Sequence, residues 1–212
     1  MPGPVRAPGT VPAAAFTPAP PARHHRAMSH ELVAYLGVMD AGKSTLALQY
    51  HHSLGGKGVV YTSMDRGGEG VVSSRIGLSH EAREVKPGFD IYDDLAATRP
   101  PYVIVDEVQF LEAPKQINHL ADAVDGLELD VYAFGLKTDF LGRLFPATQR
   151  LIELADRVEE LPVRVNCWCG ERGTHNARLR DGVMVFSGDL VEVGDMDSYT
   201  VLCRRHHRAG LA

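Results

Sequence analysis

The 212-residue chain has few of the features that tie a protein to a membrane, to disulfide bonds or to nucleic acid. It contains no apolar run near the roughly 18 residues of a membrane-spanning helix, and its first residues lack the apolar stretch of a signal peptide. Its three cysteines are an odd number, which cannot form a fully paired disulfide set. Basic residues are not in excess, because the formal charge is −5. We therefore expect a cytoplasmic protein with neither a membrane nor a nucleic acid as its partner.

Composition divides the chain into three parts. Residues 1–30 are rich in proline and alanine and contain no acidic residue, so we expect a disordered extension, with an arginine-rich targeting segment as the alternative. Residues 31–159 alternate strand-like and helix-like segments, which is typical of one nucleotide-binding domain. The pattern then changes to short β-like segments separated by glycines, which predicts a small second domain over residues 160–212.

The most specific motif is GVMDAGKS at residues 37–44. It matches the phosphate-binding loop, in which a glycine and four free positions precede Gly-Lys-Ser. An apolar run at residues 32–36 precedes the loop, and a helix-forming stretch at residues 45–50 follows it. Strand, loop and helix in this order are the context that the motif requires.

The loop supplies what a triphosphate needs. Gly37 and Gly42 allow backbone N–H groups to close around a β-phosphate. Lys43 brings a positive charge to the β and γ oxygens, and Ser44 offers a hydroxyl to Mg²⁺. The motif therefore predicts a nucleoside triphosphate as ligand.

The segments around this loop predict the fold. Besides the run before the loop, four short apolar runs are typical of strands, at residues 58–63, 89–92, 102–105 and 131–135. Three stretches are typical of helices, at residues 43–54, 114–124 and 145–155. We expect an α/β domain of the P-loop (RecA-like) type, with a mostly parallel sheet and helices on both faces, joined to a small β lobe. Ligands of such sheets bind at the carboxyl ends of the strands.

A second chemical signal is the apolar strand that ends in Asp106 and Glu107. In a P-loop protein such a strand end carries the aspartate that orients the Mg²⁺ shell, which leaves Glu107 free to act as a base. The same pair could polarise water in an ATPase. The acceptor pocket must decide between these reactions.

All three cysteines lie in the predicted lobe. Cys167, Cys169, Cys203 and His206 form two short pairs, and three thiolates with one imidazole complete a tetrahedral Zn²⁺ site. A lobe of about fifty residues has little core, so a structural metal ion would hold it closed. His207 is close enough in sequence to replace His206.

These motifs together resemble the thymidine kinases that have a zinc-binding lobe. The resemblance spans about residues 31–208 and rests on GVMDAGKST at 37–45, DEVQF at 106–110, GLKTDFLGRLFP at 135–146, and CWCG at 167–170 with Tyr199 and CRRH at 203–206. It implies ATP-dependent phosphorylation of the thymidine 5′-hydroxyl, a step of pyrimidine deoxynucleoside salvage for DNA synthesis. It also implies ATP, Mg²⁺ and structural Zn²⁺ as cofactors, and a homotetramer.

The resemblance assigns the catalytic and phosphate-binding roles. Glu107 is the expected catalytic base. The residues expected to bind ATP and Mg²⁺ are Gly37, Val38, Met39, Asp40, Ala41, Gly42, Lys43, Ser44, Thr45, Asp65, Arg66, Asp106, Glu107, Val108 and Gln109. For Asp65 and Arg66 an ordinary exposed loop pair is the equal alternative, and we expect Arg75 and Asp90 to be solvated charges.

The resemblance also assigns the nucleoside site. The expected residues are Met39, Phe110, Leu136, Phe140, Phe145, Asn176, Tyr199, and the main chain of the substrate loop Leu190, Val191, Glu192, Val193 and Gly194. Aromatic faces suit a flat base. Asn176 would contact the base through its amide or, as the alternative, be a turn residue.

Two other functions fit part of the sequence. An ATP-binding regulatory module would use the zinc lobe for a partner or DNA, and an ATPase would lack a nucleoside acceptor. The acidic balance argues against DNA, and Phe140 with Tyr199 argues against a bare ATPase. We therefore expect a thymidine kinase whose small zinc-binding β lobe carries the substrate loop.

Overall fold

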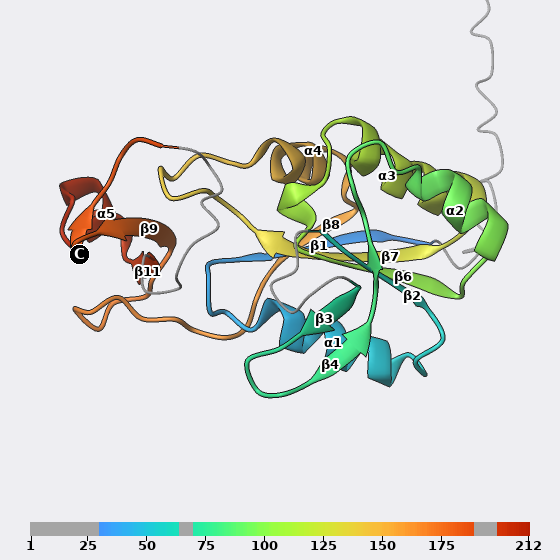
Figure 1. Cartoon of the computed structure of the whole chain (residues 1–212), viewed down its shortest axis with the longest axis horizontal. Helices are drawn as coiled ribbons and strands as arrows, with labels where there is room; N and C mark the ends of the chain where they lie inside the picture. Colours follow the sequence, from blue (N-terminus) through green and yellow to red (C-terminus); the bar gives the residue numbers. More distant parts are fainter. Residues whose placement is uncertain (1–29, 64–69, 189–198) are drawn as a thin grey trace, which may run out of the picture.

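A six-stranded parallel sheet forms the centre of the molecule (Figure 1). This computed structural model describes residues 30–63, 70–188 and 199–212. The strand order is β5-β2-β6-β7-β1-β8, and every pairing in the sheet is parallel. The strands are β1 (Leu32–Gly37), β2 (Val59–Thr62), β5 (Arg83–Glu84), β6 (Tyr102–Asp106), β7 (Asp130–Leu136) and β8 (Arg157–Glu160). The predicted parallel α/β core is confirmed.

Helices cover both faces of this sheet (Figure 1). One face carries α1 (Lys43–Ser53), and the other carries α2 (Ile91–Thr98), α3 (Lys115–Leu127) and α4 (Pro146–Leu154). Successive side chains of a strand point to opposite faces, so Ala34 of β1 enters the core under α2 to α4 while Val33 packs towards α1. Strands that are buried on both faces have continuous apolar sequences, and the sequence analysis could therefore predict β1, β6 and β7.

The predicted strand at residues 89–92 is wrong, because the chain begins α2 there. The side chain of Asp90 accepts a hydrogen bond from the backbone N–H of Asp93 at 2.9 Å and caps the helix, so Asp90 is more than a solvated charge. Ile91 and Leu95, one turn apart, are fully buried. A short apolar run with this spacing cannot be assigned from periodicity alone.

A β-hairpin that the sequence analysis did not predict lies on the α1 side of the sheet (Figure 1). It consists of β3 (Val71–Ser73) and β4 (Ser79–Glu81). His51 of α1 is buried, and its Nε2 lies 3.0 Å from Nε2 of the exposed His80 of β4. Its Nδ1 lies 3.2 Å from the Tyr102 hydroxyl. Burial, and then the neighbouring His80, lower the pKa of His51.

We expect acid to destabilise the fold through His51. Because the pKa of His51 in the folded protein lies below its usual 6.5, the unfolded chain binds the additional proton. The stabilisation by neutral His51 is therefore present above pH 6.5 and is lost as the pH falls through the lower folded value. Urea denaturation between about pH 8 and about pH 5 measures this loss. His51→Gln should flatten that dependence and the exposed control His52→Gln should not, so an unchanged slope in His51→Gln would refute the assignment.

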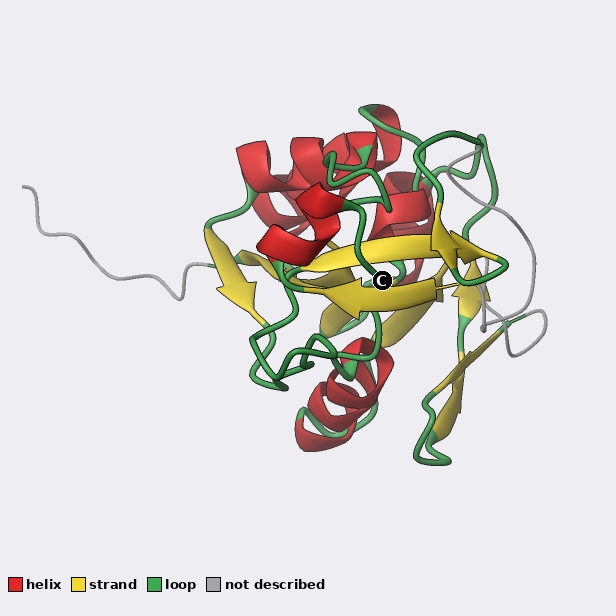
Figure 2. Cartoon of the chain, turned by 90° about the vertical axis from the view of Figure 1, so that its left-hand side faces the viewer, coloured by secondary structure: helices red, strands yellow, loops and turns green. Residues whose placement is uncertain are grey.

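The small lobe follows β8 and forms a second, antiparallel sheet, seen from its outer side in Figure 2. The sheet has the order β10-β9-β11, with β9 (His175–Arg180), β10 (Val183–Met184) and β11 (Tyr199–Leu202), and α5 (Arg204–Ala209) follows it. Its buried cluster contains Cys167, Ala177, Met184, Leu202 and Cys203. Within residues 30–63, 70–188 and 199–212, no helix is long and apolar enough to cross a membrane.

Candidate active site and metal centre

The phosphate-binding loop connects β1 to α1 at the carboxyl edge of the sheet. Gly42, which precedes the helix, has φ 73, a conformation that glycine adopts without strain. A Cβ at Gly37 would lie 2.6 Å from Cδ1 of Leu161, so a larger residue there would require the Leu161 side chain to move. The loop glycines therefore have conformational and packing roles besides leaving space for phosphate.

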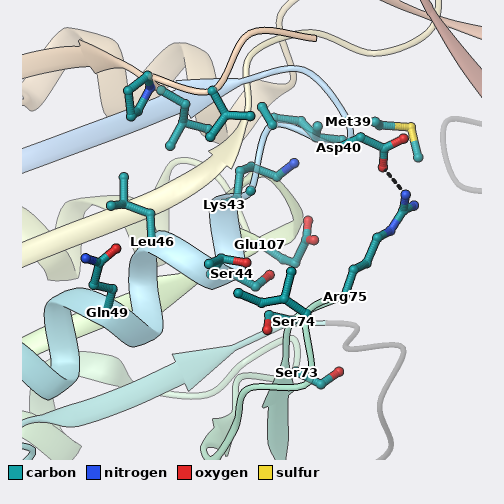
Figure 3. Close-up of a pocket in the computed structure, with 18 of the residues that line it drawn as sticks. Met39, Asp40, Lys43, Ser44, Leu46, Gln49, Ser73, Ser74, Arg75 and Glu107 are labelled. Atoms are coloured by element: carbon teal, nitrogen blue, oxygen red, sulfur yellow. Dashed lines mark ion pairs between the residues drawn. The ribbon is translucent and has the colours of Figure 1, made fainter.

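A pocket of about 640 Å³ lies over this loop (Figure 3). Its walls come from distant parts of the chain. They are residues 39–46 and Gln49, the hairpin residues 73–76, Glu107 and Phe110 after β6, Leu136 at the end of β7, and residues 161–163 that lead into the lobe. Lys43, Ser44 and Glu107 surround the same space. The pocket thus combines cationic, hydroxyl and carboxylate groups with an apolar wall.

Asp106 lies buried behind Glu107, and its environment suits a metal ion. Burial, and then the negative charge of Glu107, raise the pKa of Asp106 to about 7, against the opposing effects of the Ser44 hydroxyl and of Lys43. No group among the described residues hydrogen-bonds to Oδ1 of Asp106, although that atom is buried. A buried carboxylate oxygen without a partner, beside a serine hydroxyl, fits a hard cation such as Mg²⁺.

Glu107 has a left-handed backbone, with φ 54 and ψ 39, which is uncommon for a residue other than glycine. Its side chain lines the pocket, and its Oε2 accepts a hydrogen bond from Nε2 of Gln109. Gln109 and Val108 are buried and are not among the pocket residues. Four residues at the end of β6 were expected at the phosphates. The structure places the Glu107 side chain in the pocket, whereas Asp106, Val108 and Gln109 are buried and are not pocket residues.

Asn176 joins the lobe to the phosphate-binding loop. It is buried in β9, where its Oδ1 accepts a hydrogen bond from the backbone N–H of Met39 at 2.8 Å. Its Nδ2 donates to the carbonyl oxygen of Thr138 at 3.0 Å. Asn176 is therefore a strand residue that connects three segments, and the alternative of a turn residue is wrong.

We expect Asn176→Ala to lower the free energy of unfolding by about 2 kcal/mol, because it removes the side-chain partner of the Met39 N–H and the Thr138 carbonyl, both in partly buried residues. The KM for ATP should rise at the same time, since Met39 belongs to the phosphate-binding loop. Urea denaturation and steady-state kinetics measure the two effects. The control is Asn166→Ala, an exposed lobe residue that accepts a hydrogen bond from Arg164. Equal effects of the two substitutions would disprove this role.

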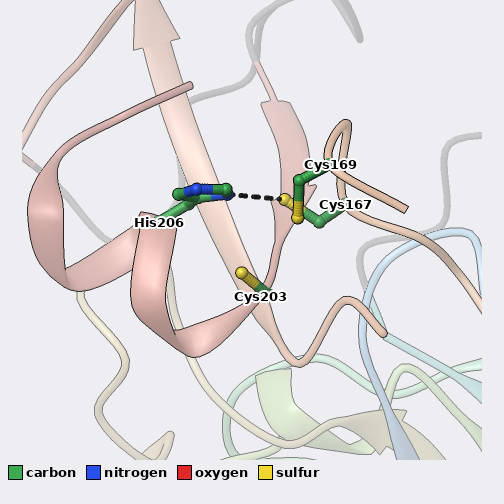
Figure 4. A group of neighbouring side chains, drawn as sticks. All are labelled: Cys167, Cys169, Cys203 and His206. Carbon is green, nitrogen blue, oxygen red and sulfur yellow. Dashed lines mark hydrogen bonds between the residues drawn. The ribbon is translucent and has the colours of Figure 1, made fainter. Parts of the chain in front are cut away.

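The candidate metal ligands converge in the lobe (Figure 4). The candidate ligand atoms of Cys167, Cys169, Cys203 and His206 all lie within 4.8 Å of one another. Burial raises the pKa of Cys167, but hydrogen bonds from the backbone N–H groups of Cys169 and Cys203, with His206, outweigh burial and lower it to about 6. The thiolate binds metal, so this environment fits a tetrahedral Zn²⁺ site.

The two adjacent histidines of α5 have different partners. Nδ1 of His206 lies 3.4 Å from Sγ of Cys167, and the His206 ring stacks on Trp168 with centroids 4.2 Å apart. Nε2 of His207 lies 2.9 Å from the carbonyl oxygen of Phe140, to which it can donate. The geometry favours His206 over His207 as the fourth ligand.

Sequence comparison with known proteins identifies the family. The sequence pattern of the thymidine kinase family matches residues 30–207. The chain belongs to the thymidine kinase family. The thymidine kinase of Streptomyces avermitilis is 54% identical over 192 residues, covering 84% of this chain and 88% of the relative. Thymidine kinases of Cutibacterium acnes (50% over 194 residues, 85% and 89% covered) and Vibrio parahaemolyticus (36% over 191 residues, 85% and 98% covered) are also similar.

The resemblance led us to expect several side chains at the nucleoside, and the structure brings only some of them together. Met39, Phe110 and Leu136 line the pocket, and the Phe145 ring packs edge-on against Phe110 with centroids 5.9 Å apart. The other two aromatic residues gather at Arg178. The Arg178 guanidinium lies 3.9 Å from the centroid of the Phe140 ring. Tyr199 of β11 stands opposite Arg178 of β9 in the register of the antiparallel pair. Asp65, Arg66, Leu190, Val191, Glu192, Val193 and Gly194 lie outside the described residues.

The structure adds pocket residues that sequence reasoning missed. Arg75, at the turn of the hairpin, lines the pocket, and its Nη1 lies 2.6 Å from Oδ1 of Asp40 (Figure 3). Arg75 is exposed, as expected of a solvated charge, but the sequence analysis did not foresee its ion pair or its place in the pocket wall. Residues 161–163 form another part of the wall. The apolar pair Val71 and Val72 was the available signal for the hairpin, but only the fold places the hairpin over the loop.

Proposed function

We propose that this kinase transfers the γ-phosphoryl group of ATP to the 5′-hydroxyl of thymidine and releases thymidine monophosphate and ADP. The observation that carries the proposal is that Lys43, Ser44 and Glu107 share one pocket with an apolar wall containing Phe110 and Leu136. The pocket has groups suited to a triphosphate and a surface suited to a flat base. Family membership supports the same reaction.

On the donor side, the phosphate-binding loop would hold ATP. Backbone N–H groups of residues 40–44 and the Lys43 ammonium would bind the phosphate oxygens. Ser44 and Asp106 would hold Mg²⁺, which supplies neutralisation of the phosphate charge when bound. Arg75 and Asp40 at the pocket rim, with Asp65 and Arg66 as predicted from the sequence, would complete this side.

On the acceptor side, the Glu107 carboxylate would accept the proton of the 5′-hydroxyl as the hydroxyl oxygen attacks the γ-phosphorus. The bond from the γ-phosphorus to the β,γ-bridging oxygen breaks, and ADP leaves with that bond's electron pair. Met39, Phe110 and Leu136 would hold the nucleoside. The proposed nucleoside site also includes Phe140, Phe145, Asn176, Tyr199 and the loop from Leu190 to Gly194. A structural Zn²⁺ in the lobe and a homotetrameric assembly complete the proposal.

The test is ADP formation by purified protein with ATP and Mg²⁺, measured with thymidine, deoxyuridine, deoxycytidine or no nucleoside. A kinase of this kind produces ADP only with an acceptor, and thymidine should give the highest kcat/KM. An equally slow rate under all conditions indicates an ATPase. ATP binding without turnover indicates the regulatory module.

A further inference from the structure

The side chain of Gln109 connects the proposed catalytic base to the central strand β7. It is only 3% exposed. Its Nε2 donates to Oε2 of Glu107, and its Oε1 accepts a hydrogen bond from the backbone N–H of Leu136 at 2.9 Å. The Leu136 N–H can only donate, so it fixes which end of the amide is oxygen. The Gln109 NH₂ group must therefore face the Glu107 carboxylate.

Strand β7 is a rigid anchor for this contact. It pairs with β1 on one side and β6 on the other. It also approaches Gln109 closely, because a Cβ at Gly135 would lie 2.6 Å from Oε1 of Gln109 and 2.6 Å from Cγ1 of Val108. Glycine at position 135 thus leaves the space in which the amide packs on the strand.

Glu107 needs such support. It follows the last residue of β6 and begins a short 3₁₀ turn, and its side chain has three rotatable bonds that must adopt one arrangement for proton transfer. Gln109 donates its hydrogen bond to Oε2 of Glu107, so Oε1 of Glu107 stays available to the acceptor hydroxyl. Catalytic groups are effective only when neighbouring side chains hold them close to the productive geometry.

We propose that Gln109 is a positioning residue that holds the Glu107 carboxylate in its catalytic orientation and does not itself contact ATP or thymidine. This departs from the role in phosphate binding that the family resemblance implied for Gln109. It rests on the proposed function of Glu107 as the base. Gln109 acts through Glu107, so its contribution should disappear when Glu107 cannot accept a proton.

The experiment is a double-mutant cycle with Glu107→Gln and Gln109→Met. Methionine keeps the side-chain length but removes both the donor to Glu107 and the acceptor of the Leu136 N–H. In the wild-type background, Gln109→Met should lower kcat by about 10- to 100-fold and change the KM values for ATP and thymidine by less than about 2-fold. In the Glu107→Gln background, the same change should lower the residual kcat by less than about 2-fold. If the two losses multiply, or if the KM for ATP rises with an unchanged kcat, the inference is wrong.

The matched control is Gln116→Met on α3. Gln116 is equally buried, donates to the carbonyl oxygens of Lys86 and Phe89, and is not a pocket residue. Gln116→Met should lower the free energy of unfolding and leave kcat unchanged. If it lowers kcat as much as Gln109→Met does, the effect of Gln109→Met is merely structural. If Gln109→Met does not fold, Gln109→Glu retains the acceptor for Leu136 and should show the same kcat loss.

The cycle also separates this inference from the proposed function. If Glu107→Gln alone remains fully active, the proposed base is wrong. If Glu107→Gln is inactive while Gln109→Met keeps the wild-type kcat, the base stands and only the positioning role of Gln109 is wrong.

Discussion

Replacing Glu107 by Gln should lower kcat by a factor of about 10²–10⁴, the usual contribution of a positioned base, while ATP binding persists. The amide has nearly the same size as the carboxylate but cannot accept the proton of the 5′-hydroxyl. Binding of ATP should persist because the phosphate-binding loop and Lys43 are unchanged. Steady-state ADP formation with thymidine measures the loss, and calorimetric titration with ATP measures the binding.

The control for this variant is Glu112→Gln, a change of a nearby carboxylate that accepts a hydrogen bond from the backbone N–H of Gly88 outside the pocket. It should retain the wild-type kcat. Full activity of Glu107→Gln would remove Glu107 from the mechanism. A large rise in the KM for ATP with little loss of kcat would instead give Glu107 a role in binding.

Removing the proposed Zn²⁺ is expected to unfold the lobe and abolish thymidine phosphorylation. The buried cluster of the lobe includes Cys167 and Cys203, so a metal ion bound there would cross-link this small core and its removal would open the cluster. The loss should extend to the pocket, because Asn176 in the lobe hydrogen-bonds to Met39. Metal analysis should find about one Zn²⁺ per chain. A chelator should abolish turnover, and added Zn²⁺ should restore it.

Cys203→Ser provides the corresponding variant. All cysteines of the chain belong to the cluster, so the control is the addition of Zn²⁺ to the chelated wild type and to the variant in parallel. Only the wild type should recover, because serine does not replace a zinc-binding thiolate. A metal-free protein with a folded lobe and full activity would show that the cluster has another role.

Local patterns predicted the parts of this protein that depend on local chemistry. The phosphate-binding loop needs its glycines, lysine and serine in one short segment, and the strands β1, β6 and β7 appear as apolar runs because both of their faces are buried. The prediction of a strand at residues 89–92 was wrong because a short apolar segment suits either a strand or the buried side of a helix. The helix cap at Asp90 was the signal that could have decided it.

The remaining features depend on contacts between distant segments. Gln109 follows the Asp106-Glu107 pair by only two residues, but its hydrogen bond and its packing are set by the backbone of β7, 26 to 27 positions later. His206 and His207 could not be distinguished from their spacing to the cysteines. Successive residues of a helix point about 100° apart, so the orientation of α5 decides which imidazole reaches the cluster.

The stacking of Trp168 on His206 also makes the lobe optically distinct. Trp168 is the only tryptophan of the chain, it is exposed, and its ring is nearly parallel to that of His206. Indole emission depends on solvent contact and on nearby quenching groups. Light absorbed selectively by tryptophan therefore yields a fluorescence signal from one place in the molecule, beside the cysteine cluster. The protein contains its own probe for following the binding and release of a metal ion at this cluster in real time, without a label.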